Sequence, residues 1–92
     1  MSAESAVTRA MRVSVVSPER VLFEGDATAV VAPCYDGLVG ILPRHAPFLS
    51  LLGEGVLTVR GADGEARFRI AGGFVQVNAN TVRVVAESTA PA

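Results

Sequence analysis

The sequence predicts an all-β domain, a flattened β-sandwich or barrel of about ten short strands. Apolar and polar residues alternate with a period of two along most of the chain, whereas helical periodicity is missing almost everywhere. Residues 65–70 show this alternation most clearly, with charged side chains on one face and apolar side chains on the other. Residues that favour turns separate the alternating runs, as expected where strands reverse direction.

The strands follow in chain order from these runs. Glycine, proline, asparagine or aspartate marks the turns at residues 17–18, 25–26, 53–55, 61–64, 72–73 and 78–80. Between them we predict strands over residues 11–16, 21–24, 27–32, 38–42, 48–52, 56–60, 65–70, 74–78 and 81–86.

The segment from Asp36 to Pro47 holds the most constrained residues of the chain. Gly37 and Gly40 permit backbone angles closed to other residues, and the two prolines of the segment fix their own angles. A helix is therefore excluded. We expect a tight turn at Asp36 and Gly37, then a short buried strand, then a rigid loop around residues 44 and 45. So many special residues in an apolar loop indicate a docking surface without chemistry.

The length of 92 residues predicts a single domain. We expect residues 1–10 to be a flexible extension, residues 11–87 the β-sandwich and residues 88–92 a tail, because termini without apolar anchors rarely order. The first ten residues contain Glu4 and Arg9 and have no continuous apolar segment, so no signal peptide is expected. No apolar run approaches the roughly 20 residues of a membrane-spanning helix. The sequence thus favours a cytosolic protein.

Charge and composition limit the partners. The net charge is -1 and the arginines are scattered singly, so a basic patch for nucleic acid or for an anionic membrane surface is not expected. Half of the residues are hydrophobic and only 18% are charged, whereas soluble domains usually carry about 25%. Part of this apolar surface is expected to contact a partner protein. The alternative is a composition merely rich in alanine and valine.

Residues for chemistry are scarce, and we predict no catalytic, metal or cofactor site and no small-molecule substrate. The chain has no lysine, which excludes Schiff-base chemistry, and one histidine with one cysteine are too few ligands for zinc. The alternative is a stand-alone β-sandwich enzyme or ligand-binding domain that uses Cys34, His45 and Asp36. An ordinary buried cysteine, a loop histidine and a turn aspartate are favoured, because no activating partner is evident.

Two segments carry a family resemblance. Residues 15–25, Val-Val-Ser-Pro-Glu-Arg-Val-Leu-Phe-Glu-Gly, are similar to the opening of the epsilon subunit of F-type ATP synthase. Residues 40–49, Gly-Ile-Leu-Pro-Arg-His-Ala-Pro-Phe-Leu, resemble its central Gly-Ile-Leu-Pro-Gly-His-Ala-Pro-Leu-Leu signature. Residues 55–57, 72–75, 77 and 82–86 follow the family pattern in the same order, so the resemblance extends over residues 11–87.

The resemblance implies a non-catalytic subunit of a proton-transporting complex. It implies a ten-stranded flattened β-sandwich in the central stalk, which joins the gamma subunit to the c-ring and couples proton flow to ATP synthesis. It also implies a peripheral position on the cytoplasmic face of the bacterial inner (plasma) membrane. Contact with the c-ring is expected at Asp36, Gly37 and Leu38, and contact with gamma at Arg44, His45, Phe48, Leu49 and Ser50.

The sequence departs from the family pattern in two respects that affect function. The chain stops at Ala92, so we expect a truncated form without the C-terminal helical hairpin that can inhibit ATP hydrolysis; the alternative is a fragment of a longer subunit. Leu38 replaces a frequent acidic residue, which leaves Asp36 to supply any charged contact with the ring, and Arg44 replaces glycine.

Three side chains are expected to anchor the interface with gamma, and Arg44 is suited to pair with a carboxylate of that partner. The candidate anchors are Tyr35, Phe48 and Leu49. The substitution Phe48→Asp is expected to keep the isolated fold largely intact and to abolish co-purification with gamma.

Overall fold

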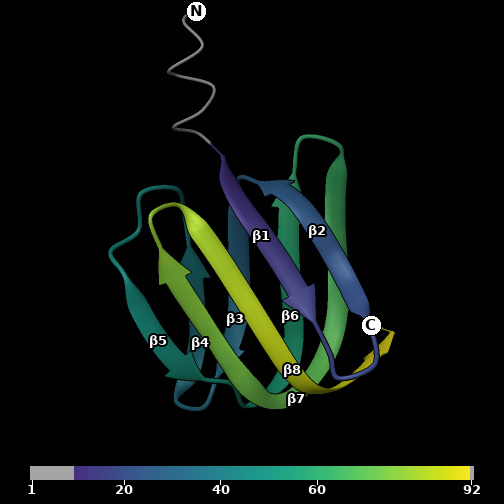
Figure 1. Ribbon diagram of the computed structural model, residues 1–92. Coiled ribbons are helices and arrows are strands. Elements are labelled where there is room, and N and C mark those ends of the chain that lie inside the picture. The colour runs from purple at the N-terminus through teal and green to yellow at the C-terminus, as the bar shows by residue number, and fades with distance from the viewer. Residues whose placement is uncertain (1–9, 92) are drawn as a thin grey trace, which may run out of the picture.

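The computed structural model describes residues 10–91 and contains a sheet of eight β-strands (Figure 1). No helix in this part of the chain is long and apolar enough to cross a membrane. The strands are β1 (Met11–Val16), β2 (Val21–Ala27), β3 (Ala29–Cys34), β4 (Gly37–Ile41), β5 (Phe48–Leu51), β6 (Glu54–Gly61), β7 (Gly64–Asn78) and β8 (Thr81–Pro91).

One continuous sheet folds over on itself to make the two layers of a sandwich, which confirms the predicted fold class. The strand order is β2-β1-β8-β7-β6-β3-β4, and β5 adds to the free side of β7. All pairs are antiparallel except β1 with β8, which run parallel. In Figure 1, β1 and β8 cross the front of the molecule while β3 and β6 lie behind them.

A pair of glycines forms the corner between the two layers. Gly72 and Gly73 have φ of 74° and 111°, values that L side chains rarely adopt. A Cβ on Gly73 would also collide with the carbonyl oxygen of Val85 on β8. Opposite the corner, the Leu52 N–H donates to the Gly73 carbonyl at 2.9 Å. The chain therefore bends here with the same β7–β8 register on both sides of the corner, Gly72 being left out of the pairing.

The two strands predicted over residues 65–70 and 74–78 are in fact the single strand β7, so the chain does not reverse at residues 72–73. The second possibility that the sequence offers for this glycine pair, a bulge or a close backbone crossing between sheets, is the one that the structure confirms. The glycines bend the strand instead of reversing it. Residues 64–71 pair with β6, and residues 74–77 pair with β5. Strand β8 crosses the same corner beside β7. Strands β7 and β8 each contribute one segment to each layer, so the eight strands supply ten strand segments. This accounts for the predicted number of about ten strands.

The tail expected over residues 88–92 differs from the structure, in which β8 continues to Pro91. Ile70 faces Thr89 and Arg69 faces Ala90 in the β7–β8 ladder. Backbone pairing with β7 holds this segment, so it needs no apolar anchor of its own. Apart from Ala10, the extension expected over residues 1–10 lies outside the described residues.

The core lies between the layers and is built from alternate residues of the strands. Within residues 10–91 no polar or charged side chain is buried in it. Cys34, at the end of β3, belongs to this core with 5% exposure. The other members of this buried hydrophobic cluster are Met11, Val13, Val15, Ala27, Val30, Ala32, Ile41, Leu52, Leu57, Val59, Ile70, Val75, Val77, Val82, Val84 and Ala86.

Candidate docking site

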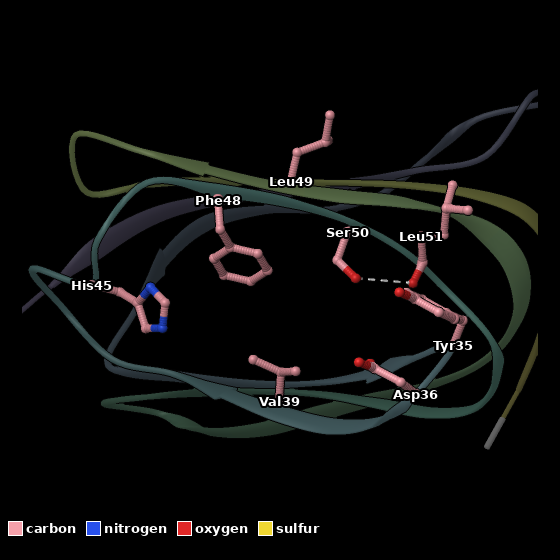
Figure 2. A pocket seen from close by; sticks show the side chains of 8 residues that line it. All are labelled: Tyr35, Asp36, Val39, His45, Phe48, Leu49, Ser50 and Leu51. Carbon is pink, nitrogen blue, oxygen red and sulfur yellow. Dashed lines mark hydrogen bonds between the residues drawn. The ribbon is translucent and has the colours of Figure 1, made fainter.

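A groove of about 550 Å³ opens between β4 and β5 (Figure 2). In the described part of the chain β4 pairs only with β3, and β5 only with β7, so both are edge strands. Phe48 and Ser50 of β5 point into the groove toward Val39 of β4, whereas Leu49 and Leu51 point away from it. The full lining is Tyr35, Asp36, Val39, His45, Phe48, Leu49, Ser50 and Leu51.

Opposite ends of this groove are formed by a tight hairpin turn and by a proline-containing loop. Tyr35 and Asp36 are the two turn residues that join β3 to β4, and Gly37 follows with φ of 131°. The tight turn predicted at Asp36 and Gly37 is therefore confirmed, displaced by one residue. At the other end the His45 N–H donates to the Leu42 carbonyl at 3.1 Å, which closes a turn around residues 43 and 44.

Arg44 occupies the position of that turn where glycine is normally required. Proline before it and its own φ of 70° are the features of a type II turn. Its backbone N–H donates a 2.6 Å hydrogen bond to Oδ1 of Asn80 in the β7–β8 turn. The next residue, His45, places Nδ1 2.7 Å from the Ala46 carbonyl oxygen, and its ring centroid lies 5.0 Å from that of Phe48. These contacts join the loop to the β7–β8 turn and to β5.

The five residues predicted to contact gamma do not share one surface. His45, Phe48 and Ser50 line the groove, Leu49 also projects onto the outer face of β5, and Arg44 is exposed on the loop. Of the residues predicted to contact the c-ring, Asp36 lines the same groove, and Gly37 and Leu38 follow at the start of β4. The structure therefore brings parts of both sets together along one side of the sandwich.

Phe48 is the least exposed of the three candidate anchors. Its side chain is half-buried and packs against the hydrophobic core. The expectation that Phe48→Asp leaves the fold intact is inconsistent with this packing, because a carboxylate there would be partly desolvated. Leu49 and Tyr35, the other proposed anchors, are 67% and 70% exposed and remain available to a partner.

A row of apolar side chains crosses the outer face of the front layer, which contains β2, β1, β5 and the adjoining parts of β8 and β7. The sequence does not predict this row. Cross-strand pairing puts these side chains side by side on β5, β7, β8, β1 and β2 in turn. Outward positions of a one-sided sheet are normally polar. The adjacent valines at 15–16 and 84–85 were the available signal, since they make a strand apolar on both faces. We call this row the apolar belt: Leu51, Phe74, Val85, Val16 and Val21.

The belt continues into the β3–β4 hairpin. The Tyr35 N–H donates to the Leu51 carbonyl at 3.0 Å, so the turn of the hairpin lies against one end of the belt. We call Tyr35, Asp36, Gly37 and Leu38 the hairpin tip. Six large hydrophobic side chains are strongly exposed in the described residues, and five of them lie between positions 35 and 51. These six are Val21, Tyr35, Leu38, Leu42, Leu49 and Leu51.

Toward the β7–β8 turn the same outer face becomes polar. One row beyond the belt, Arg83 lies between Gln76 and Ser14. One row further, Arg12 pairs with Asp26 at 3.6 Å. The front layer therefore presents an apolar end and a polar, arginine-containing end.

The residues of the alternative enzyme hypothesis do not form a reactive site. Cys34 is buried in the core, whereas Asp36 is exposed on the turn and His45 bonds a neighbouring carbonyl. No hydrogen bond within residues 10–91 joins these three side chains. In the same residues, histidine, cysteine, aspartate and glutamate never gather in threes that could hold a metal ion.

Comparison with known proteins points to one family. Residues 10–92 match the family model described as ATP synthase, Delta/Epsilon chain, beta-sandwich domain. The ATP synthase epsilon chain of Leptospira borgpetersenii is 40% identical over 77 residues, which cover 84% of this chain and 61% of that protein. That of Maricaulis maris is 45% identical over 73 residues, which cover 79% and 55%. The chain thus spans between half and two thirds of the length of these relatives.

Solved structures share the fold. A chain in the Euglena gracilis mitochondrial ATP synthase, in an assembly of OSCP, F1 and c-ring, matches with a TM-score of 0.83 at 21% identity, covering 90% of this chain and 54% of that one. A chain in the central stalk and c-ring of the Tetrahymena thermophila mitochondrial ATP synthase matches with a TM-score of 0.74 at 20% identity, covering 88% and 66%.

Proposed function

Because this chain belongs to the ATP synthase delta/epsilon-chain family through its β-sandwich domain, we propose that it is the epsilon subunit of the central stalk in an F-type, proton-translocating ATP synthase. In this role it joins the gamma subunit to the c-ring, so that rotation driven by proton flow reaches the catalytic head. It acts as a non-catalytic subunit on the cytoplasmic face of the bacterial plasma membrane, held there through the complex.

One observation carries the proposal: the exposed apolar side chains form a continuous surface. The apolar belt crosses five strands, and the hairpin tip adjoins its Leu51 end. Leu51 and Val21 are 64% and 60% exposed although each is large and aliphatic. Extended apolar surface of this kind on a small domain marks a contact with another protein.

Two adjacent surfaces suit a subunit that bridges two neighbours. We assign the apolar belt, with Leu49 and the His45 end of the groove, to gamma. We assign the hairpin tip to the c-ring, where Asp36 is the one charged side chain. An interface stable enough to transmit rotation buries about 1,200–2,000 Å² in total. The belt and the tip together offer the apolar centre of such an interface.

Pull-down from membranes tests the proposal, with tagged variants expressed in the bacterium that encodes the chain. The unchanged protein should retain both gamma and the c-ring. Leu51→Asp should lose gamma, because a carboxylate in the belt would be desolvated in the interface. Leu38→Asp should weaken retention of the ring more than retention of gamma.

The matched control is Ala62→Asp, which places the same new carboxylate on the exposed β6–β7 turn. It should retain both partners. Circular dichroism confirms that each variant is folded. Recovery of neither partner by the unchanged protein, or of both partners by Leu51→Asp at the level of the control, would contradict the proposal.

A further inference from the structure

We propose that Arg44 and Arg83 recognise carboxylate groups on the partner that covers the apolar belt. The inference rests on the proposed function and specifies the chemistry of its interface. It assigns to gamma a surface that is apolar where it meets the belt and acidic where it meets the polar end of the front layer.

The first argument for this proposal is the backbone conformation of Arg44. The fold itself gains nothing from an arginine at this position. Its φ of 70° is strained for any residue that has a Cβ. The hydrogen bond to Asn80 uses only the backbone N–H, which glycine would supply equally well. Ala79 and Asn80 also have positive φ, but they are the two turn residues of the β7–β8 hairpin, where such values are usual. At Arg44 the strain is kept by a long charged side chain that the fold does not use, which points to a function outside the fold.

The charges of the two arginines are the second ground. The ion pairs within residues 10–91 are Arg12 with Asp26 and Arg60 with Glu65. Neither uses Arg44 or Arg83. The cross-strand neighbours of Arg83 on its face are Gln76 and Ser14, which are uncharged. Both guanidinium groups are therefore open to a carboxylate from another chain, for which their planar donor geometry is well suited.

The position of the arginines relative to the belt is the third ground. Arg83 lies two residues from Val85 of the belt on the same face of β8, about 6.8 Å along the strand. Residues four apart on a helix are about 6 Å apart along its axis. A partner helix aligned with β8 that places an apolar side chain on Val85 thus places the residue four positions away over Arg83. Arg44 extends this polar end, because its loop is bonded to the adjoining β7–β8 turn.

The test is a titration of the gamma subunit encoded in the same genome with Arg44→Gln and Arg83→Gln, at about 50 mM and 300 mM salt. Each variant should weaken binding about threefold to tenfold at low salt, the range expected of a single interfacial ion pair. The difference from the unchanged protein should shrink at high salt, because the charges are then screened. Arg67→Gln, which removes an exposed arginine from β7 in the other layer, is the control and should bind within about twofold of the unchanged protein.

The variant Arg44→Gly separates the effect of the backbone strain on stability from the effect of the charge on binding. It relieves the left-handed strain and removes the charge, so the isolated domain should melt at a higher temperature while binding weakens as in Arg44→Gln. Unchanged affinity of both Gln variants at low salt would overturn the inference. If Leu51→Asp still abolishes binding in that case, the proposed function stands; if Leu51→Asp also binds normally, the proposed function fails as well.

Discussion

The backbone N–H of Arg44 donates a 2.6 Å hydrogen bond to Oδ1 of Asn80, and this contact fastens the loop before β5 to the β7–β8 turn. The carbonyl oxygen of Asn80 accepts a second bond, 2.9 Å long, from the N–H of Arg12 on β1. One residue thus holds together three segments that are distant in sequence. It also adopts a φ of 60°, which asparagine tolerates better than most residues.

Replacing this residue should destabilise the domain. Asn80→Ala removes the acceptor for the Arg44 N–H and places alanine in a left-handed conformation, with a combined cost of about 1–3 kcal/mol. Urea unfolding followed by circular dichroism measures the change. Asn78→Ala, at an exposed position two residues earlier, is the control and should stay within about 0.5 kcal/mol. Equal stability of the two variants would show that the Asn80 side chain does not hold the loop.

The glycine corner should tolerate no side chain. Gly73→Ala would bring a Cβ onto the Val85 carbonyl oxygen at a φ of 111°, so we expect a loss of about 3 kcal/mol or more, or failure to fold. Gly40→Ala is the matched control. A Cβ on Gly40 meets no atom within 4 Å, and its backbone is not in a glycine conformation. Urea unfolding should leave Gly40→Ala within about 0.5 kcal/mol of the unchanged protein. A Gly73→Ala domain of normal stability would be incompatible with the corner described above.

Two neighbouring residues of β5 should differ strongly in how much stability the domain loses when each is replaced by aspartate. Phe48 packs against the core, so Phe48→Asp should lower the free energy of unfolding by about 3 kcal/mol. Leu49 is 67% exposed on the outer face, so Leu49→Asp should change it by less than about 1 kcal/mol. Thermal melts of the two isolated domains make the comparison. The reverse order of stability would mean that Leu49, and not Phe48, is on the face of β5 that packs against the core.

The reactivity of the Cys34 thiol tests whether this residue is part of the core or an accessible nucleophile. Because its side chain is 5% exposed, a thiol reagent should modify it at least about 100-fold more slowly in the folded domain than in urea. Thiol titration with a chromogenic disulfide at neutral pH gives both rates. Rapid modification of the folded domain would instead support the alternative of a reactive site at Cys34.

Local patterns in the sequence were sufficient to predict most of the fold. Alternation identifies the strands, and the Asp36–Gly37 pair identifies the hairpin. The glycines at 72 and 73 left the number of strands open, because two glycines between apolar runs fit a reversal of the chain as well as a bend or bulge within one strand. Only the pairing of β7 with both β5 and β6 separates the two.

The docking surface was harder to predict, because it depends on register between distant strands. The exposed residues at 35, 38 and 49 were found within one stretch of sequence. The apolar belt was not, since its members come from five strands and become neighbours only when β1 pairs with β8 in parallel. The effect of Phe48→Asp on stability could not be predicted for a related reason: in an edge strand, the sequence alone does not show which face points into the core.

The heat capacity change on binding gamma tests the burial of the apolar belt most directly. Calorimetric titration of gamma with the isolated domain at several temperatures should give a ΔCp of about -0.3 kcal/mol/K, as expected for a standard-sized interface that is mostly apolar. Leu51→Ser should weaken binding and make ΔCp less negative. Tight binding with a ΔCp near zero, unaffected by Leu51→Ser, would contradict the account.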